Sequence, residues 1–261
     1  MIKMIVTDLD RTLLHTDKTI SAYTAAVFAR CRGRGIKIAF ATARPKRAVM
    51  HFCDIIPIDA LILHNGALVY VGGERVVHHG IMPDVRDGIM QAISRDMPEA
   101  FMSVEIDDLL HVNFDVPDEW RDVAFKKTAL IDLPDRPADK IIVGSALFGH
   151  AAALNKEQLQ KYIPAELYVE SSSDQPPIEM IMNCHATKWN AVQTIAAHFC
   201  IKTAEIVAFG DDFNDILMLQ GCGVGVAVAN AIDEAKAAAD HICGANDENG
   251  VARWLEEHVL K

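Results

Sequence analysis

The segment of residues 4–12, MIVTDLDRT, places two carboxylates directly behind a short apolar run. An apolar run of this length predicts a buried strand over residues 4–8. Because alternate side chains of a strand share a face, Asp8 and Asp10 could point toward one site. Two carboxylates this close repel each other unless a cation or a shared proton relieves them. The pattern favours a Mg²⁺ site for phosphate chemistry, and a helix N-cap or an Asx-turn is the structural alternative.

A second acidic segment follows another predicted strand, residues 205–209, near the far end of the chain. It reads GDDFND over residues 210–215 and brings three carboxylates and an amide to the point where a strand would pass into a helix. Capping of that helix explains one carboxylate, since Asp favours helix N-termini, but it does not explain three. A divalent cation would relieve their repulsion, and the spacing excludes an EF-hand loop.

Two further turns carry groups suited to an anion. The predicted strand 36–41 ends at Thr42, where a hydroxyl and turn amides could hold phosphate oxygens, although Thr also commonly caps helices. Lys188 opens a helix-like stretch, residues 189–199, at the end of the helix where the dipole disfavours a cation. An anionic ligand would offset that cost, and a solvated surface lysine is the structural alternative.

Taken in this order, the four segments resemble the motifs of the haloacid dehalogenase superfamily of phosphohydrolases. The resemblance is carried by residues 8–12 (DLDRT), 41–44 (ATAR), Lys188 and 210–215 (GDDFND). Three more stretches resemble the Cof-type subgroup: residues 64–67 (HNGA), 225–231 (GVAVANA) and 248–252 (ENGVA). The resemblance covers residues 1–79 and 186–261, while the middle of the chain matches only in length and placement. Family members often have glycine where this chain has Arg11, Ala43 and Trp189, and aspartate where it has Asn249.

The resemblance implies a role for each residue of the site. Asp8 would be the nucleophile and Asp10 the general acid and base. Mg²⁺ would be held by Asp8, the Asp10 carbonyl and Asp211. The groups that would bind the phosphoryl oxygens are Thr42, Lys188, Asn214 and the amides near Leu9 and Ala43. Asp212 and Asp215 would orient the metal's waters or Lys188.

The order of predicted elements divides the chain into a core and an insertion. Strands and helices alternate in both outer parts, which predicts a parallel sheet with right-handed crossovers. The elements expected there first are strands 4–8, 36–41 and 60–64, helices 22–34 and 45–53, and a hairpin of 67–70 with 75–78. The middle mixes strands 101–106, 109–114, 141–147, 167–171 and 178–182 with helices 84–96, 118–130 and 151–162. We therefore predict an α/β, Rossmann-like core of residues 1–81 and 185–261 with an inserted α+β cap domain, residues 82–184.

In the resembling family, a cap inserted at this point is of type II, covers the active site and selects the substrate. Polar residues of its strand-like runs are candidates for contacting the leaving group: Glu105, Asp107, His111 and Asn113. A surface position is the simpler expectation for each of them.

The amino-acid composition limits the classes of binding partner that are expected. The 261 residues are 51% hydrophobic, and the net charge of −11 argues against a general nucleic-acid binder. No apolar run approaches the ~20 residues that span a bilayer, and the N-terminus does not read as a signal peptide. The six cysteines lack metal-site spacing and read as reduced thiols: Cys31, Cys53, Cys184, Cys200, Cys222 and Cys243. We expect a cytoplasmic protein, monomer or homodimer, without membrane or nucleic-acid partners.

These observations together predict a Mg²⁺-dependent phosphatase that hydrolyses small phosphorylated metabolites through an aspartyl-phosphate intermediate. A phosphotransferase or phosphomutase would use the same intermediate and is one alternative. A sensor that binds a phosphometabolite without catalysis is the other, but it should lack the nucleophile or the acid, and every catalytic position is filled. A P-type ATPase is excluded because Asp stands at position 10, where those pumps have Thr.

Overall fold

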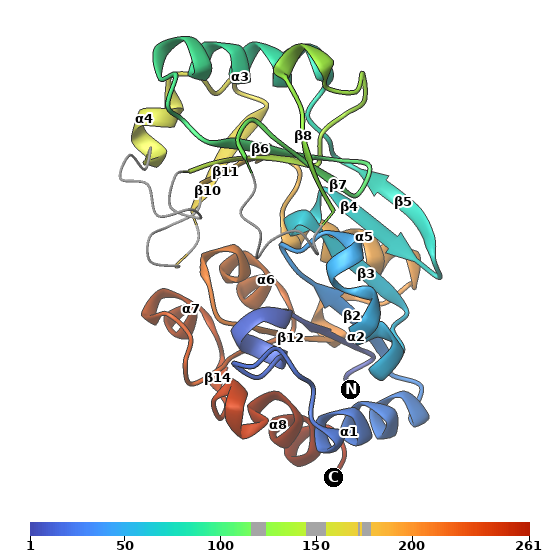
Figure 1. Ribbon diagram of the computed structural model, residues 1–261. Coiled ribbons are helices and arrows are strands. Elements are labelled where there is room, and N and C mark those ends of the chain that lie inside the picture. The colour runs from blue at the N-terminus through green and yellow to red at the C-terminus, as the bar shows by residue number, and fades with distance from the viewer. Residues whose placement is uncertain (116–123, 145–154, 172, 174–178) are drawn as a thin grey trace. The chain divides into compact units, whose positions relative to one another are not determined.

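The computed structural model describes residues 1–115, 124–144, 155–171, 173 and 179–261 (Figure 1). Contacts divide the chain into two compact units. One, here called the core unit, comprises Met1–Val77 and Thr187–Lys261, and the other, the inserted unit, comprises His78–Ala186. The predicted boundaries lie a few residues from these. Residues before the predicted cap join the inserted unit because Ile81 is buried and exchanges two backbone hydrogen bonds with Ala138.

The core unit is built on an eight-stranded sheet with the order β14-β13-β12-β1-β2-β3-β4-β5. The strands are β1 (Met4–Thr7), β2 (Lys37–Ala41), β3 (Ala60–Leu63), β4 (Leu68–Val71), β5 (Glu74–His78), β12 (Ile206–Gly210), β13 (Val224–Ala227) and β14 (His241–Ile242). Strands β14 to β3 are mutually parallel, and β4 is antiparallel to β3. The predicted parallel sheet and its terminal hairpin are therefore confirmed.

Helices cover both faces of this sheet (Figure 1). They are α1 (Ala22–Gly33), α2 (Met50–Ile55), α5 (Lys188–His198), α6 (Ile216–Gly221), α7 (Asp233–Ala238) and α8 (Gly250–His258). Burial on both faces explains why β1 and β12 read as continuous apolar runs, with Met4 and Phe209 fully buried. Ser21 caps α1, its hydroxyl accepting a hydrogen bond from the Thr24 amide at 3.1 Å.

The inserted unit has its own six-stranded sheet, with the order β10-β11-β9-β6-β7-β8. Its elements are α3 (Pro83–Asp96), β6 (Met102–Ile106), β7 (Leu109–Val112), β8 (Phe125–Lys127), β9 (Lys140–Val143), α4 (Lys156–Gln160), β10 (Leu167–Ser171) and β11 (Glu179–Asn183). All its pairings are antiparallel except that of β7 with β8. A separate apolar core, which includes Ile93 and Ile141, holds this unit together.

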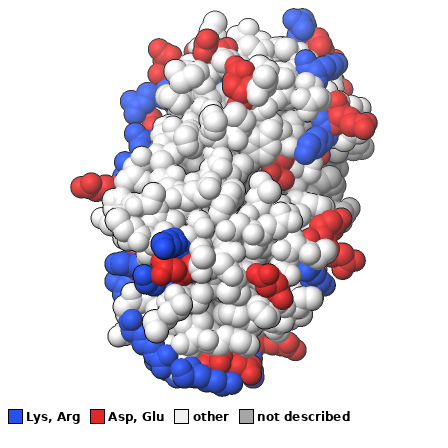
Figure 2. Space-filling model, turned by 180° about the vertical axis from the view of Figure 1, so that it is seen from behind, with Lys and Arg blue, Asp and Glu red and all other residues white. Residues whose placement is uncertain are grey.

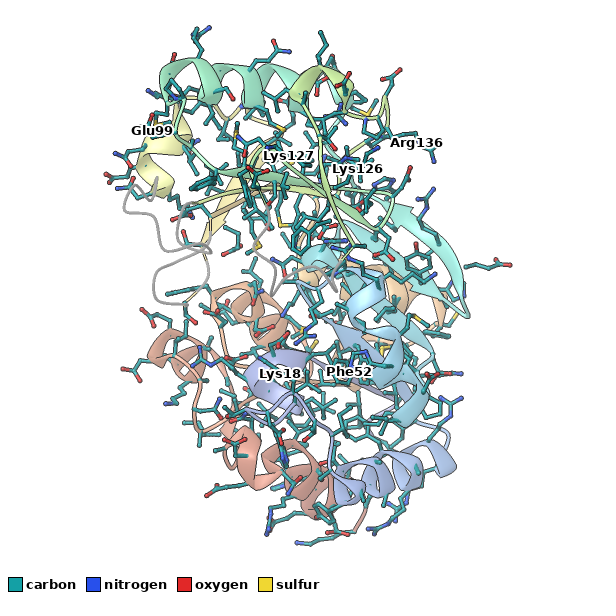
Figure 3. All side chains as sticks on the ribbon, viewed as in Figure 1. Lys18, Phe52, Glu99, Lys126, Lys127 and Arg136 are labelled. Carbon is teal, nitrogen blue, oxygen red and sulfur yellow. The ribbon has the colours of Figure 1, made fainter. Side chains whose placement is uncertain are left out.

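Some predicted elements of the inserted unit differ from the structure. The predicted helix 118–130 is wrong at β8, whose residues Lys126 and Lys127 are labelled in Figure 3. Strand pairing with β7 satisfies this backbone and overrides the local pattern. Parts of four predicted elements, namely residues 118–123, 145–147, 151–154 and 178, lie outside the described residues.

The four polar residues proposed for contact with a leaving group differ in burial and in their partners. Glu105 and His111 are each only 3% exposed, so the expectation of a surface position is wrong for both. Nδ1 of His111 lies 2.9 Å from the Thr128 hydroxyl. The Asn113 side chain bonds backbone groups on both of its polar ends, while the exposed Asp107 pairs with an arginine at 3.3 Å.

Charged side chains of both signs mark the surface. On the face shown in Figure 2, basic side chains stand beside acidic ones. Within the described residues, every helix is too short or too polar to cross a bilayer. All six cysteines are unpaired, as expected for reduced thiols.

Candidate active site

The candidate site lies in the core unit, at the carboxyl ends of neighbouring parallel strands. Strand β1 lies between β12 and β2, and Asp8, Asp211 and Thr42 follow these three strands directly. Polar residues that leave adjacent parallel strands at the same edge meet in space, although they are far apart in the sequence. From β1 the chain adds β2 and β3 on one side of the sheet and later β12, β13 and β14 on the other, so the strand order reverses at β1 and β12. Such a reversal is where a ligand is expected in an open α/β sheet.

The strand predicted over residues 4–8 ends at Thr7, so the alternation argument for Asp8 and Asp10 is wrong. Asp8 begins a tight π-helical turn, Leu9–Leu13, in which Arg11 has a φ of 59°. This turn sends Asp8 and Asp10 to different partners. It also brings the Thr12 hydroxyl to Asp211, where it donates a buried hydrogen bond to Oδ1 at 2.7 Å.

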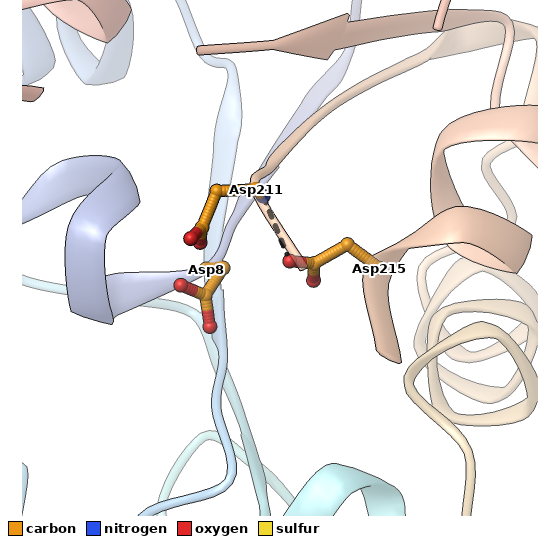
Figure 4. A group of neighbouring side chains, drawn as sticks. All are labelled: Asp8, Asp211 and Asp215. Carbon is orange, nitrogen blue, oxygen red and sulfur yellow. Dashed lines mark hydrogen bonds between the residues drawn. The ribbon is translucent and has the colours of Figure 1, made fainter. Parts of the chain in front are cut away.

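Three buried carboxyl groups and one ammonium group form what is here called the carboxylate cluster: Asp8, Asp211, Asp215 and Lys188. One oxygen atom from each carboxyl group lies within 4.8 Å of the others, and Figure 4 shows the three side chains. Nζ of Lys188 donates to Oδ1 of Asp8 and to Oδ1 of Asp215, both at 2.7 Å. Lys188 is 1% exposed, so the solvated surface lysine is excluded.

The turn after β12 explains how Asp215 reaches this position. Its Oδ2 accepts hydrogen bonds from the backbone amides of Asp211, at 2.9 Å, and Asp212, at 3.2 Å (the first is the dashed line in Figure 4). Gly210 leaves the necessary space, because a Cβ there would lie 2.4 Å from the Asp215 side chain. The remaining oxygen of Asp215 is thereby directed at Lys188, as the predicted orienting role requires.

The electrostatics of the carboxylate cluster favour protons or a cation. Burial raises the pKa of Asp8 well above its ordinary value, and the other carboxylates add to this while Lys188 opposes it. Burial and the charge of Asp215 raise the pKa of Asp211 to about 7. Burial alone would lower the pKa of Lys188, but the charges of Asp215 and Asp8 outweigh it and raise that pKa.

Asp10 belongs to a separate group, here called the Asp10 cluster, with Arg44 and Lys18. Arg44 donates to both oxygens of Asp10 at 2.6 Å, and Lys18, labelled in Figure 3, donates to Oδ1 at 2.8 Å. Burial alone would raise the pKa of Asp10, but these hydrogen bonds and charges outweigh it and lower that pKa to about 2.

The other predicted residues surround these clusters. The buried hydroxyl of Thr42 accepts a hydrogen bond from the Arg44 amide at 3.2 Å. Nδ2 of Asn214 donates to Oδ1 of Asn65 at 3.0 Å. The Asp212 carboxylate accepts a hydrogen bond from the next backbone amide at 2.8 Å, so it caps a turn. Leu9 is buried and Ala43 half-buried, each beside one of the clusters in sequence.

Four contacts of the site were not predicted from the sequence, namely those of Arg44, Thr12, Asn65 and Lys18. Arg44 and Thr12 lay inside the quoted motifs, so their position was a signal that they face the site. Asn65 lay inside the HNGA stretch, which had a resemblance but no assigned role. Lys18 has no local signal, because only the fold of the loop after the first motif brings it to Asp10.

Comparison with known proteins identifies the family. A family model described as haloacid dehalogenase-like hydrolase matches residues 5–255. A putative phosphatase of Haemophilus influenzae is 28% identical over 272 residues, which is 98% of each chain. The pyridoxal phosphate phosphatase YbhA of Escherichia coli is 28% identical over 280 residues, which is 99% of each chain. The crystal structure of SMU.1108c from Streptococcus mutans UA159, at 21% identity, has the same fold, with a TM-score of 0.84 over 100% of both chains.

The matched region contains all four motifs, and the strand ends of the core unit bring their side chains to one edge. The chain therefore belongs to the haloacid dehalogenase-like hydrolases, and the enzyme class predicted from its motifs, a phosphomonoesterase, is confirmed with the family.

Proposed function

We propose that this phosphatase depends on Mg²⁺ and removes phosphate from small phosphorylated metabolites through an aspartyl-phosphate formed on Asp8. The observation that carries the proposal is the double hydrogen bond of Lys188, to Asp8 and to Asp215, inside a buried group of carboxylates. Lys188 favours the ionised form of Asp8 and aims it toward the edge where the other motif turns end. An oriented, ionised carboxylate is what nucleophilic attack on phosphorus requires.

The donor set of the carboxylate cluster fits Mg²⁺. Three carboxylates lie beside the Lys188 ammonium group and, at 3.7 Å from Asp211, the guanidinium of Arg11. Burial and the repulsion among the carboxylates raise the pKa values of Asp8 and Asp211, and a bound cation would offset both effects. Oxygen ligands are those that Mg²⁺ prefers. Asp8, Asp211 and the Asp10 carbonyl would hold the ion, with Asp215 fixing Lys188 and the turn. When bound, the ion screens the charge of the phosphate from the attacking carboxylate.

Each chemical step can be assigned to a side chain. An oxygen of Asp8 bonds to phosphorus as the bond to the leaving alcohol breaks, and Asp10 gives that alcohol its proton. Asp10 then takes a proton from water, whose oxygen displaces Asp8 and releases inorganic phosphate. Thr42, Lys188, Asn214 and the amides of Leu9 and Ala43 stabilise charge on the transferring group.

The Asp10 cluster sets a condition on this mechanism. In the free protein Asp10 is ionised, the state in which it activates water. To protonate an alcohol, Asp10 must first gain a proton. Arg44 and Lys18 must therefore release the Asp10 carboxylate in the first step. A bound phosphate is the natural competitor for both cations, since each pairs as readily with phosphate as with a carboxylate.

The substrate class follows from the family and from the inserted unit. The proposed substrates are small phosphomonoesters, such as sugar phosphates or the pyridoxal phosphate named for the E. coli relative. The inserted unit is proposed to act as a type II cap that selects among them. The cytoplasmic location and the monomeric or dimeric state stay predictions.

The test begins with purified protein, Mg²⁺ and a panel of phosphometabolites, with phosphate release as the readout. Turnover should require Mg²⁺ and should be absent in excess chelator. Ca²⁺ should inhibit it, because Ca²⁺ prefers more ligands at longer distances. Acid quenching with a substrate labelled in the phosphoryl group should trap the label on the wild-type protein and not on Asp8→Asn.

The alternatives give different results in the same experiment. Transfer of the label to a second sugar would show a phosphotransferase. Binding of a metabolite without phosphate release would show a sensor. Full turnover in excess chelator would contradict the metal assignment, and label retained on Asp8→Asn would contradict the nucleophile.

A further inference from the structure

We infer that Asn65 is a positioning residue of this site: it sets the orientation of the Asn214 carboxamide and, through it, the affinity for phosphate. This inference rests on the proposed role of Asn214 as a ligand of the phosphoryl group. It gives a role to the HNGA turn, which none of the catalytic steps above uses. The motivating observation is the 3.0 Å hydrogen bond from Nδ2 of Asn214 to Oδ1 of Asn65.

Asn65 is held firmly enough to act as a reference point. It is 1% exposed and lies in the 3₁₀ turn His64–Gly66 directly after β3. Its backbone amide donates to the carbonyl of Thr42 at 3.0 Å, which joins the turn to the end of the neighbouring strand β2. On the other side Gly66 packs against Thr187, because a Cβ at Gly66 would lie 2.4 Å from the Thr187 carbonyl oxygen. The turn therefore touches three of the segments that carry phosphate-binding groups.

The backbone of Asn65 explains why the chain has asparagine there. Its φ is 55°, in the left-handed region that costs most side chains free energy but that Asn and Gly tolerate. Glycine would permit the turn but would leave Asn214 without an acceptor. Asparagine satisfies both the backbone and the hydrogen bond.

The hydrogen bond decides which end of the Asn214 amide faces a ligand. Oδ1 of Asn65 is an acceptor, so it binds the NH₂ end of Asn214 and fixes the orientation of the carboxamide. The second N–H of that NH₂ group is the donor that we assign to a phosphate oxygen. Within the described residues, Oδ1 of Asn214 is buried and has no hydrogen-bond partner. Without Asn65, rotation of the amide would exchange its two ends and could present this oxygen to a phosphate oxygen, which repels it.

The test is a double-mutant cycle of Asn65→Gly with Asn214→Ala. Asn65→Gly keeps the left-handed backbone and the amide bonded to Thr42, and it removes only the side chain. The readouts are kcat/KM for the best phosphomonoester and the Kd of inorganic phosphate with Mg²⁺. Asn65→Gly should weaken both by about tenfold in the wild-type background, and by less than about twofold when Asn214 is already alanine.

Asn249→Gly is the matched control. Asn249 also has a left-handed backbone, with a φ of 57°, and its side chain accepts hydrogen bonds from Ser21 and Thr24 in the same unit. This variant should lower Tm at least as much as Asn65→Gly and leave kcat/KM and the phosphate Kd within about twofold of the wild type.

The outcomes separate this inference from the proposed function. Equal losses from Asn65→Gly in both backgrounds, in both readouts, would overturn the inference. So would a loss in Asn249→Gly that matches the loss in Asn65→Gly, because it would trace the effect to stability. Coupling in the phosphate Kd without any turnover by the wild type would uphold the role of Asn65 and overturn the proposed function.

Discussion

The two charged clusters of the site begin two residues apart in the sequence and have opposite electrostatics. In the carboxylate cluster, Asp8 shares the Lys188 ammonium group with Asp215 and lies beside the buried Asp211, and its pKa is raised. In the Asp10 cluster, one carboxylate is shared by two cations, and its pKa is lowered to about 2. The Asp8 side chain is 8% exposed, whereas the Asp10 side chain is 35% exposed.

The difference shows how one motif can supply two kinds of carboxylate. Each pKa follows from the balance between burial and neighbouring charge, and not from the residue type. The first cluster is short of positive charge, so it is suited to a cation and to a nucleophile that a cation activates. The second has an excess of positive charge, so it keeps a carboxylate ionised until a ligand draws the cations away.

The largest effect is expected for Asp8→Asn. The amide keeps an oxygen that can accept from Lys188, so the fold should persist, but an amide is a poor nucleophile. Turnover should fall by at least about 10⁴-fold, as on removal of other catalytic nucleophiles. Asp233→Asn is the matched control, because the side chain of Asp233 is fully exposed on α7, and its rate should equal that of the wild type. Phosphate release by Asp8→Asn near the wild-type rate would refute the assignment.

The second-largest loss of turnover is expected for Asp10→Asn. Loss of a general acid and base costs about 10²–10⁴-fold in rate, and this range is expected for alkyl phosphates. An activated aryl phosphate needs no proton on its leaving group, so the loss in its first step should be smaller. The comparison is made by measuring kcat for both ester types in both proteins. A loss under about tenfold for the alkyl ester would show that Asp10 is not the acid.

Lys188→Met tests the carboxylate cluster through stability. Removal of one partner from a buried ion pair typically costs about 3–5 kcal/mol of unfolding free energy at neutral pH. Because the pKa of Asp8 is raised, this carboxyl gains its proton as the pH is lowered, so the cost should shrink at lower pH. Urea denaturation at pH 5 and pH 8 measures both quantities. An equal loss at the two pH values would mean that lost packing, and not charge, explains the destabilisation.

The smallest expected effect is the pH dependence of stabilisation by Mg²⁺. Because the pKa values of Asp8 and Asp211 are raised in the folded protein, the stability they contribute is present near pH 4 and is lost as the pH rises toward about 7. Binding of Mg²⁺ displaces those protons. The increase in Tm on adding Mg²⁺ should therefore be small at pH 5 and larger at pH 8, by a few degrees at most.

Asp211→Asn is the control for this measurement. This substitution removes a carboxyl group whose pKa is raised and which is also a proposed Mg²⁺ ligand. The pH-dependent part of the Tm increase should therefore largely disappear. A Tm increase that is the same at pH 5 and pH 8, or larger at pH 5, would contradict the assignment of this cluster as the metal site.

Much of the core unit could be predicted because its signals are local. The apolar runs before Asp8 and Asp211 are continuous, which is typical of strands buried on both faces, and the alternating helices imply the parallel order. The inserted unit was harder to predict. Its strand β8 has no clear local pattern and forms by pairing with β7, and the burial of His111 follows from the sheet around it.

The sequence by itself determined the family, the parallel core and the residue types of the site, because motif spacing and apolar periodicity are written along the chain. Only the tertiary structure decided which charges meet. Lys188 reaches Asp8 from 180 positions away, and Arg44 reaches Asp10 from 34. A local pattern carries no information on such contacts, since they depend on how strand ends and turns converge. The opposite pKa shifts of two neighbouring carboxylates therefore arise from folding alone.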